Sequence, residues 1–165
     1  MQSHFEVLFE AAGDRYPQPE DLSLVTQYVA SIPERLKTYQ RLRDQELAVM
    51  QQIADQLPEH LPAAVDAELE QSLIKGALTL RYCAMGLLLN DVSFVQARIT
   101  SWLSEALLTE LTQADRLVYD LMTQQLNRLL SASQQALFHP MFAVAIELLV
   151  NAETAEPELT LAAMF

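Results

Sequence analysis

The sequence predicts a single all-α domain. Its 165 residues suit one hydrophobic core, and 51% of them are apolar. Apolar residues recur at the three- and four-residue spacing of a helix, whereas the alternation typical of a strand is nearly absent. Only three glycines occur, and prolines and turn-forming residues separate the helical stretches. We expect about eight helices joined by short loops.

The expected helices follow one another along the whole chain. They cover residues 4–12, 19–32, 36–43, 44–57, 63–89, 92–108, 112–130 and a last segment from Ser133 or Pro140 to 150. Pro33 is expected to kink or divide the second stretch, because proline lacks a backbone N–H. Arg43-Asp44 is the expected break between the helices at 36–43 and 44–57, and Pro58 and Pro62 bracket a loop.

Capping residues define the helix ends in the second half. Asn90-Asp91 should close the long central helix, and Ser93 can cap the next one. Thr112 followed three residues later by Asp115 is a capping-box pattern. We take residues 1–150 as the domain. The tail, 151–165, is acidic and then apolar; both disorder and a short docking segment remain open for it.

Composition argues against several classes of function. The net charge of −12 disfavours nucleic-acid binding, because acidic residues flank the one basic cluster, at residues 35–43. No apolar run is long enough to span a bilayer, and the N-terminal residues do not resemble a signal peptide. The lone Cys83 excludes an internal disulfide and fits a reducing, cytoplasmic compartment.

No pattern of catalytic or metal-binding residues is visible. His4, His60 and His139 are the only histidines, and no two have the spacing of a helical zinc site. The helix after the central one lacks a histidine that could hold haem. Nucleophile elbows and phosphate-binding glycine loops are missing. We therefore expect neither an enzyme nor a metal site.

Two segments carry a more specific signal. Gly13-Asp14-Arg15-Tyr16, with Leu22 further on, resembles the G-R-Y turn of phycobiliprotein subunits (the phycocyanin/allophycocyanin superfamily). Leu80-Arg81-Tyr82, followed by Asn90-Asp91 and Arg98, is similar to the L-R-Y stretch of the β-type subunits. The likeness covers about residues 3–150. It implies a globin-like fold with an N-terminal helical hairpin extension, here about residues 1–32.

The resemblance also shows what this chain lacks. The family attaches a linear tetrapyrrole, a bilin, through a C-x-R-D motif whose Cys lies nine residues before the Arg of L-R. Here Ser72, Ile74 and Lys75 stand at the Cys, Arg and Asp positions. A serine cannot form the thioether, and a lysine ammonium opposes the protonated pyrrole nitrogens. A chain free of bound cofactor is therefore expected.

The function implied is a non-pigmented binding protein for phycobilisome or photosystem subunits, acting in their assembly, regulation or turnover. The expected contact residues are Phe5, Leu8, Phe9, Arg15 and Tyr16, because a helix of about three turns needs a partner surface. Packing of this helix on its own domain remains open as the alternative. The partner in the family is another subunit, so a homo- or hetero-oligomer through the N-terminal helices is expected. The location would be cytoplasmic, at the cytoplasmic face of the thylakoid.

One alternative assigns a ligand to the interior of the domain. Lys75, Tyr82 and Trp102 could line a pocket for a non-covalently bound bilin or other tetrapyrrole. Core packing is the competing explanation for both aromatic residues.

Overall fold

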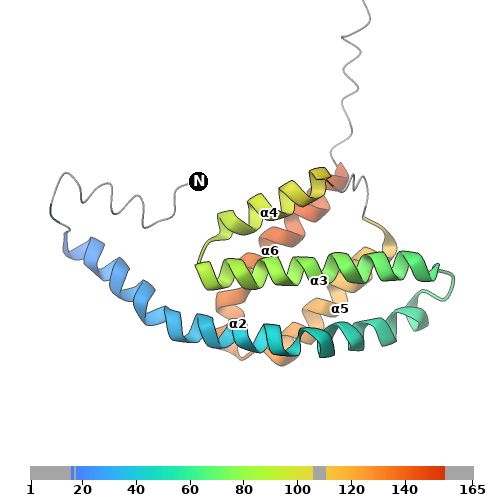
Figure 1. Ribbon diagram of the computed structural model, residues 1–165, viewed down its shortest axis with the longest axis horizontal. Helices are drawn as coiled ribbons and strands as arrows, with labels where there is room; N and C mark the ends of the chain where they lie inside the picture. Colours follow the sequence, from blue (N-terminus) through green and yellow to red (C-terminus); the bar gives the residue numbers. More distant parts are fainter. Residues whose placement is uncertain (1–15, 17, 106–110, 155–165) are drawn as a thin grey trace, which may run out of the picture.

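The computed structural model describes residue 16, residues 18–105 and residues 111–154. Every regular element in this part is an α-helix: α2 (Pro19–His60), α3 (Asp66–Leu89), α4 (Val92–Glu105), α5 (Gln113–Leu129) and α6 (Ala132–Thr154) (Figure 1). The predicted all-α fold is thus confirmed. The helix expected over residues 4–12 lies outside the described residues.

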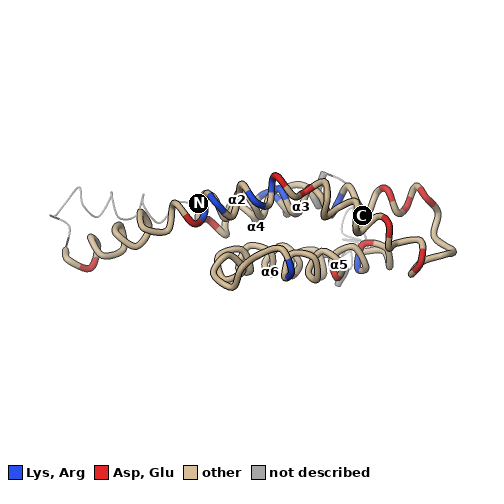
Figure 2. The backbone as a smooth tube through the Cα atoms, turned by 90° about the horizontal axis from the view of Figure 1, so that it is seen from below, with Lys and Arg blue, Asp and Glu red and all other residues tan. Residues whose placement is uncertain are grey.

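The central helix α3 packs against all four other helices. The turn after His60 folds α3 back along α2, and these two helices form one layer, while α5 and α6 form the other (Figure 2). α4 packs on both α3 and α6. Large side chains from the helices fill the space between the layers, among them Leu42, Ile53, Leu80, Leu87, Ile99, Val118 and Met122.

Two glycines let α3 approach its neighbours closely. A Cβ atom at Gly76 would lie 2.7 Å from Val118 Cγ1 and 3.0 Å from Met122 Sδ, both on α5. A Cβ atom at Gly86 would collide with Val95 on α4. Glycine is costly within a helix, by about 1 kcal/mol relative to alanine, so these positions serve the crossings of α3 with α5 and α4.

The longest helix differs from expectation. α2 runs without a break for 42 residues, so the predicted break at Arg43-Asp44 is wrong. Pro33 does not divide the helix, and the helix continues through Pro58, where a loop was expected to begin, as far as His60. The core-facing positions Leu42, Val49 and Ile53 keep helical spacing across that point. Further apolar residues on the exposed side, including Leu47, obscure this register in the sequence.

Helix ends agree with the sequence in part. Asn90 ends α3 in the left-handed conformation with φ 55°, and Thr112 and Asp115 form the expected capping box of α5. Asp91, not Ser93, caps α4, because Asp91 Oδ1 accepts a hydrogen bond from the Ser93 N–H at 2.8 Å. The last helix begins at Ala132, not at Ser133 or Pro140, and Ser131 caps it, because Ser131 Oγ accepts a hydrogen bond from the Gln134 N–H.

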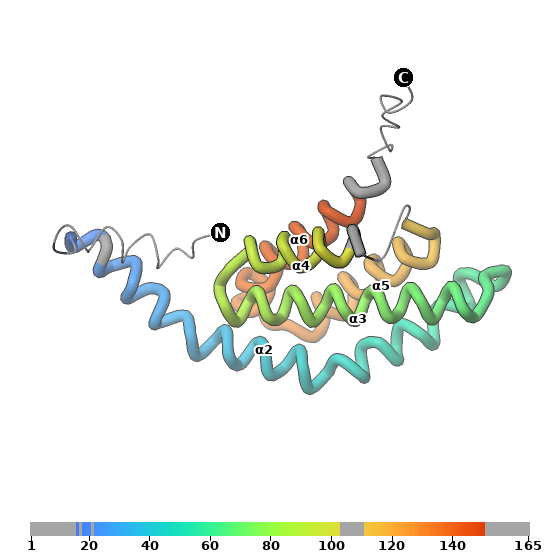
Figure 3. Tube along the Cα trace, turned by 45° about the horizontal axis from the view of Figure 1, so that its top comes forward, coloured from blue at the N-terminus to red at the C-terminus, as the bar shows by residue number. Residues whose placement is uncertain are grey.

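The N-terminal part of α2 extends beyond the other helices (Figure 3). We call residues 19–36 the α2 arm. Its exposed apolar side chains are Leu22, Leu24, Val25, Val29, Ile32 and Leu36. Five of them, leaving out Leu24, follow the alternating three- and four-residue spacing of a helix-packing stripe. The arm therefore presents an apolar stripe suited to another helix.

Of the helices described, α3 alone has the length and composition that a membrane crossing would need. This is weak support for a span, because core helices of folded proteins share these properties, and 44% of the relevant window is buried inside this domain.

Candidate functional site

The three residues that the resemblance aligns with the pigment motif, Ser72, Ile74 and Lys75, do not share one environment. Ser72 is buried, with 1% of its surface exposed, and Lys75 is mostly buried, whereas Ile74 is half exposed on the opposite side of α3. Only Ser72 and Lys75 therefore face the interior of the domain.

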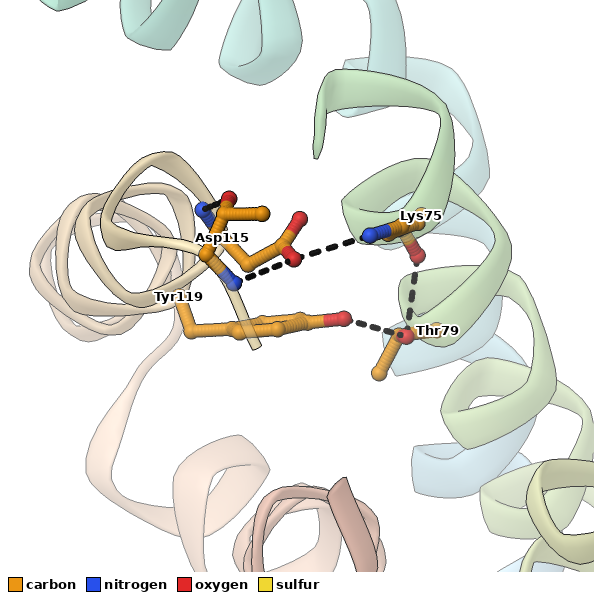
Figure 4. A network of polar contacts seen from close by, with 5 residues as sticks. Lys75, Thr79, Asp115 and Tyr119 are labelled. Atoms are coloured by element: carbon orange, nitrogen blue, oxygen red, sulfur yellow. Dashed lines mark hydrogen bonds and ion pairs between the residues drawn. The ribbon is translucent and has the colours of Figure 1, made fainter. Parts of the chain in front are cut away.

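A buried ion pair joins α3 to α5 at this site (Figure 4). Lys75 Nζ donates to Asp115 Oδ2 at 2.8 Å, and the two side chains are 12% and 0% exposed. The same carboxylate oxygen accepts from the Thr112 N–H at 3.0 Å, and Thr112 Oγ1 accepts from the Asp115 N–H at 3.1 Å. Asp115 thus serves both as the capping acid of α5 and as the counter-ion of Lys75.

Hydrogen bonds extend this network along α3. Thr79 Oγ1 donates to the Lys75 carbonyl oxygen at 2.9 Å and lies 3.3 Å from the Tyr119 hydroxyl (Figure 4). Burial, the main cause, raises the pKa of Tyr119 to about 12. The phenol is therefore neutral at physiological pH, when it can both donate and accept a hydrogen bond.

The carboxylate of Asp115 is ionised despite its burial. Burial by itself would raise its pKa, but hydrogen bonds from Lys75 and Thr112, the nearby Ser72 hydroxyl and the lysine charge outweigh it, so the pKa lies below its ordinary value. Asp115 Oδ1 and Ser72 Oγ are buried side-chain atoms without a hydrogen bond of regular geometry. The serine hydroxyl is nevertheless close enough to help lower the carboxyl pKa.

The chemical character of the site follows from these contacts. Lys75 is neutralised by an acid from the same chain. Ser72 is covered by protein. Cys83, the one thiol, is fully buried, and burial raises its pKa, so it is a poor nucleophile.

The alternative pocket residues do not line any of the three cavities that we describe between the helices. Tyr82 and Trp102 are partly buried against the core, and Lys75 is held by Asp115. The three cavities instead lie between α5 and α6, with a volume of about 520 Å³, and at two places between α2 and α3, with volumes of about 320 and 310 Å³. A non-covalent tetrapyrrole site at these three residues stays a prediction.

Among the expected contact residues, Phe5, Leu8, Phe9 and Arg15 lie outside the described residues, and Tyr16 is 92% exposed just before the α2 arm.

A buried cation holds the arm in place. Arg35 is 1% exposed, lies over the Tyr28 ring at 4.2 Å and donates from Nη1 to the Leu88 carbonyl oxygen at 3.0 Å. The C-terminal end of α3 thus anchors the arm, because helix C-termini attract cations.

The sequence did not reveal two of these contacts. Lys75 and Asp115 are 40 residues apart, and Arg35 and Leu88 are 53 apart. The capping-box pattern identified Asp115 as a cap, but nothing in it identifies a counter-ion on another helix. In the sequence, Arg35 is one member of the basic cluster at residues 35–43.

The comparison with protein families decides the classification. The family model described as phycobilisome protein matches residues 10–149. The chain belongs to the phycobilisome protein family. As a phycobilisome-family protein it has the globin-like helical fold of that light-harvesting, non-enzymatic family, as the resemblance implied. No curated protein matches this phycobilisome-family protein.

Proposed function

We propose that this phycobilisome-family protein is a non-pigmented binding protein that acts in the assembly, regulation or turnover of phycobilisomes or photosystems through protein–protein contacts. The observation that carries the proposal is the buried Lys75–Asp115 ion pair. A group bound at the pigment position would have to displace an interaction whose partners are both shielded from water.

The energetics support a closed site. Separating a buried pair leaves an uncompensated charge, which costs about 3–5 kcal/mol. A bilin entering beside Ser72 would have to supply that free energy and would meet a cation where the family provides an acid. The lone thiol, Cys83, makes its hydrogen bond to the Met141 carbonyl oxygen inside the core, at 3.6 Å. Covalent attachment at either position is therefore disfavoured.

The contact function is supported by the α2 arm. Its apolar stripe, which includes Val29 at 55% and Leu22 at 55% exposure, lies outside the packed core. Exposed apolar surface of this kind is typical of protein-interaction sites. Together with Phe5, Leu8, Phe9, Arg15 and Tyr16, the arm is the surface that we assign to phycobilisome or photosystem subunits, or to a second copy of the chain.

Two measurements test the proposal. The protein purified from its native host should show no visible absorption band, and affinity purification should recover phycobilisome or photosystem subunits. Val29→Asp in the stripe should abolish that recovery. The same change at an exposed polar residue of the arm, Gln27→Asp, should leave it intact. A coloured protein, or recovery that is equal for both variants, would contradict the proposal.

A titration with free bilin separates the proposal from the alternative of a non-covalent tetrapyrrole carrier. We expect no spectral shift of the bilin on mixing. A saturable shift that disappears on replacing Tyr82 or Trp102 would favour the carrier instead.

A further inference from the structure

A groove of about 520 Å³ runs between α5 and α6, and its lining includes no residue of the α2 arm or of the Lys75–Asp115 pair. We call it the α5–α6 groove. Its apolar lining includes Leu126, Leu130, Phe138, Phe142, Ile146 and Val150. Exposed residues such as Thr123, Asn127 and Ala143 form part of the same lining, so the groove opens to solvent.

The helix on one side of the groove is unusually poor in charge for a helix with an exposed face. Between residues 132 and 150, α6 carries only one Asp, Glu, Lys or Arg residue, Glu147. Exposed positions on α6 are instead residues such as Ala143 and Val150, which is 39% exposed. An apolar groove on such a face indicates that another apolar segment covers it.

The chain itself supplies such a segment. α6 ends at Thr154, one turn beyond Val150 at the end of the groove. The eleven residues that follow, 155–165, lie beyond the part that the phycobilisome family model matches, which ends at residue 149. Their last seven are apolar apart from Thr160. The tail therefore begins at the end of α6, next to the groove.

Length and pattern both permit a return of this segment. Eleven extended residues reach about 36 Å, whereas α6 from Phe138 to Thr154 is about 24 Å long. In an extended segment alternate side chains face the same way, which would place Leu159, Leu161 and Phe165 together and Thr160 on the other side. A short tether also keeps the segment at a millimolar effective concentration near the groove.

We propose that residues 159–165 dock into the α5–α6 groove of the same chain as an intramolecular strap. The strap places Leu159, Leu161 and Phe165 against the apolar lining and leaves the acidic residues 156 and 158 in solvent. It shields the apolar face of α6 until a competing segment displaces it. This inference does not depend on the proposed binding function of the arm.

Paramagnetic relaxation enhancement in the full chain tests the strap. A nitroxide is attached through Thr160→Cys, and the amide signals of ¹⁵N-labelled protein are compared before and after reduction of the nitroxide. Cys83 is buried, and its raised pKa keeps it from reacting. We expect strong broadening at Ala143 and Ile146 and none in the α2 arm.

Matched variants define the contact. Ala143→Glu places a charge in the groove and should abolish the broadening at Ile146. Ala136→Glu changes an exposed alanine on the same helix outside the groove lining and should leave it intact. Circular dichroism checks that both variants keep the fold.

Three outcomes would overturn the strap. One is an absence of broadening along the groove. Another is broadening that both glutamate variants reduce equally. The third concerns a mixture of two kinds of chain, one ¹⁵N-labelled without a nitroxide and one nitroxide-labelled without ¹⁵N. Broadening seen only in that mixture would assign the groove to the tail of a second copy.

Discussion

Removing Lys75 is the most informative perturbation of the buried network. Lys75→Met keeps the length and the apolar part of the side chain while deleting its charge. Asp115, which is 0% exposed, then loses the partner 2.8 Å away and keeps only the capping contacts with Thr112 and the nearby Ser72 hydroxyl. A buried carboxylate without a counter-ion is the expected result.

The magnitude follows from burial. Breaking one partner of a buried pair costs about 3–5 kcal/mol. The exposed pair formed by Arg81 and Glu46 provides a matched control on the same helix, because its side chains are 61% and 20% exposed. Such a pair contributes about 1 kcal/mol or less. Lys75→Met should therefore destabilise the fold by at least about 2 kcal/mol more than Arg81→Met.

The pH dependence has a definite sign. The wild-type pKa of Asp115 lies below its ordinary value, so its stabilisation is present above about pH 4 and is lost as the pH falls through the folded pKa. Without Lys75, burial raises that pKa above its ordinary value. The variant then regains stability as the pH falls from 7 toward about 4, and its difference from the wild type shrinks.

Urea unfolding followed by circular dichroism measures these free energies at each pH. Asp115→Asn in the Lys75→Met background should restore part of the loss, because no unpaired charge remains. Equal destabilisation by Lys75→Met and Arg81→Met, or a difference from wild type that does not change between about pH 4 and 7, would refute the interpretation of a buried, coupled pair.

Three further predictions follow from single positions. Gly76→Ala should lower the free energy of unfolding by about 1 kcal/mol, because contact with Val118 outweighs the gain in helix propensity; unchanged urea unfolding would contradict this. The wild type should lose stability above about pH 10, because the pKa of Tyr119 is raised to about 12 in the folded protein and the phenol ionises first in the unfolded chain. Tyr119→Phe should remove this loss. Parallel profiles of unfolding free energy against pH for the two proteins would argue against it. Ser72→Cys should react on the order of 100-fold more slowly with a thiol reagent than Ser133→Cys, since reaction requires local opening; comparable rates would mean that position 72 is open to solvent.

The sequence predicted features that depend on neighbouring residues. Helical spacing identified the all-α class, and the Thr112–Asp115 pattern identified a cap that the structure confirms. It was less successful for α2, where the expected break at Arg43-Asp44 does not occur. Exposed apolar residues on the arm and at Leu47 add a second stripe, so spacing alone did not define which side faces the core.

By itself, the sequence determined the helical composition and the family resemblance, because these depend on residue identity and short spacing. The replacement of the pigment motif at Ser72, Ile74 and Lys75 stays a prediction from that resemblance. Only the tertiary structure decided that Lys75 pairs with Asp115 across 40 residues and that Arg35 is buried against the end of α3. The physical reason is that a side chain's partner and its exposure to water depend on how helices cross, and chain spacing does not encode that crossing.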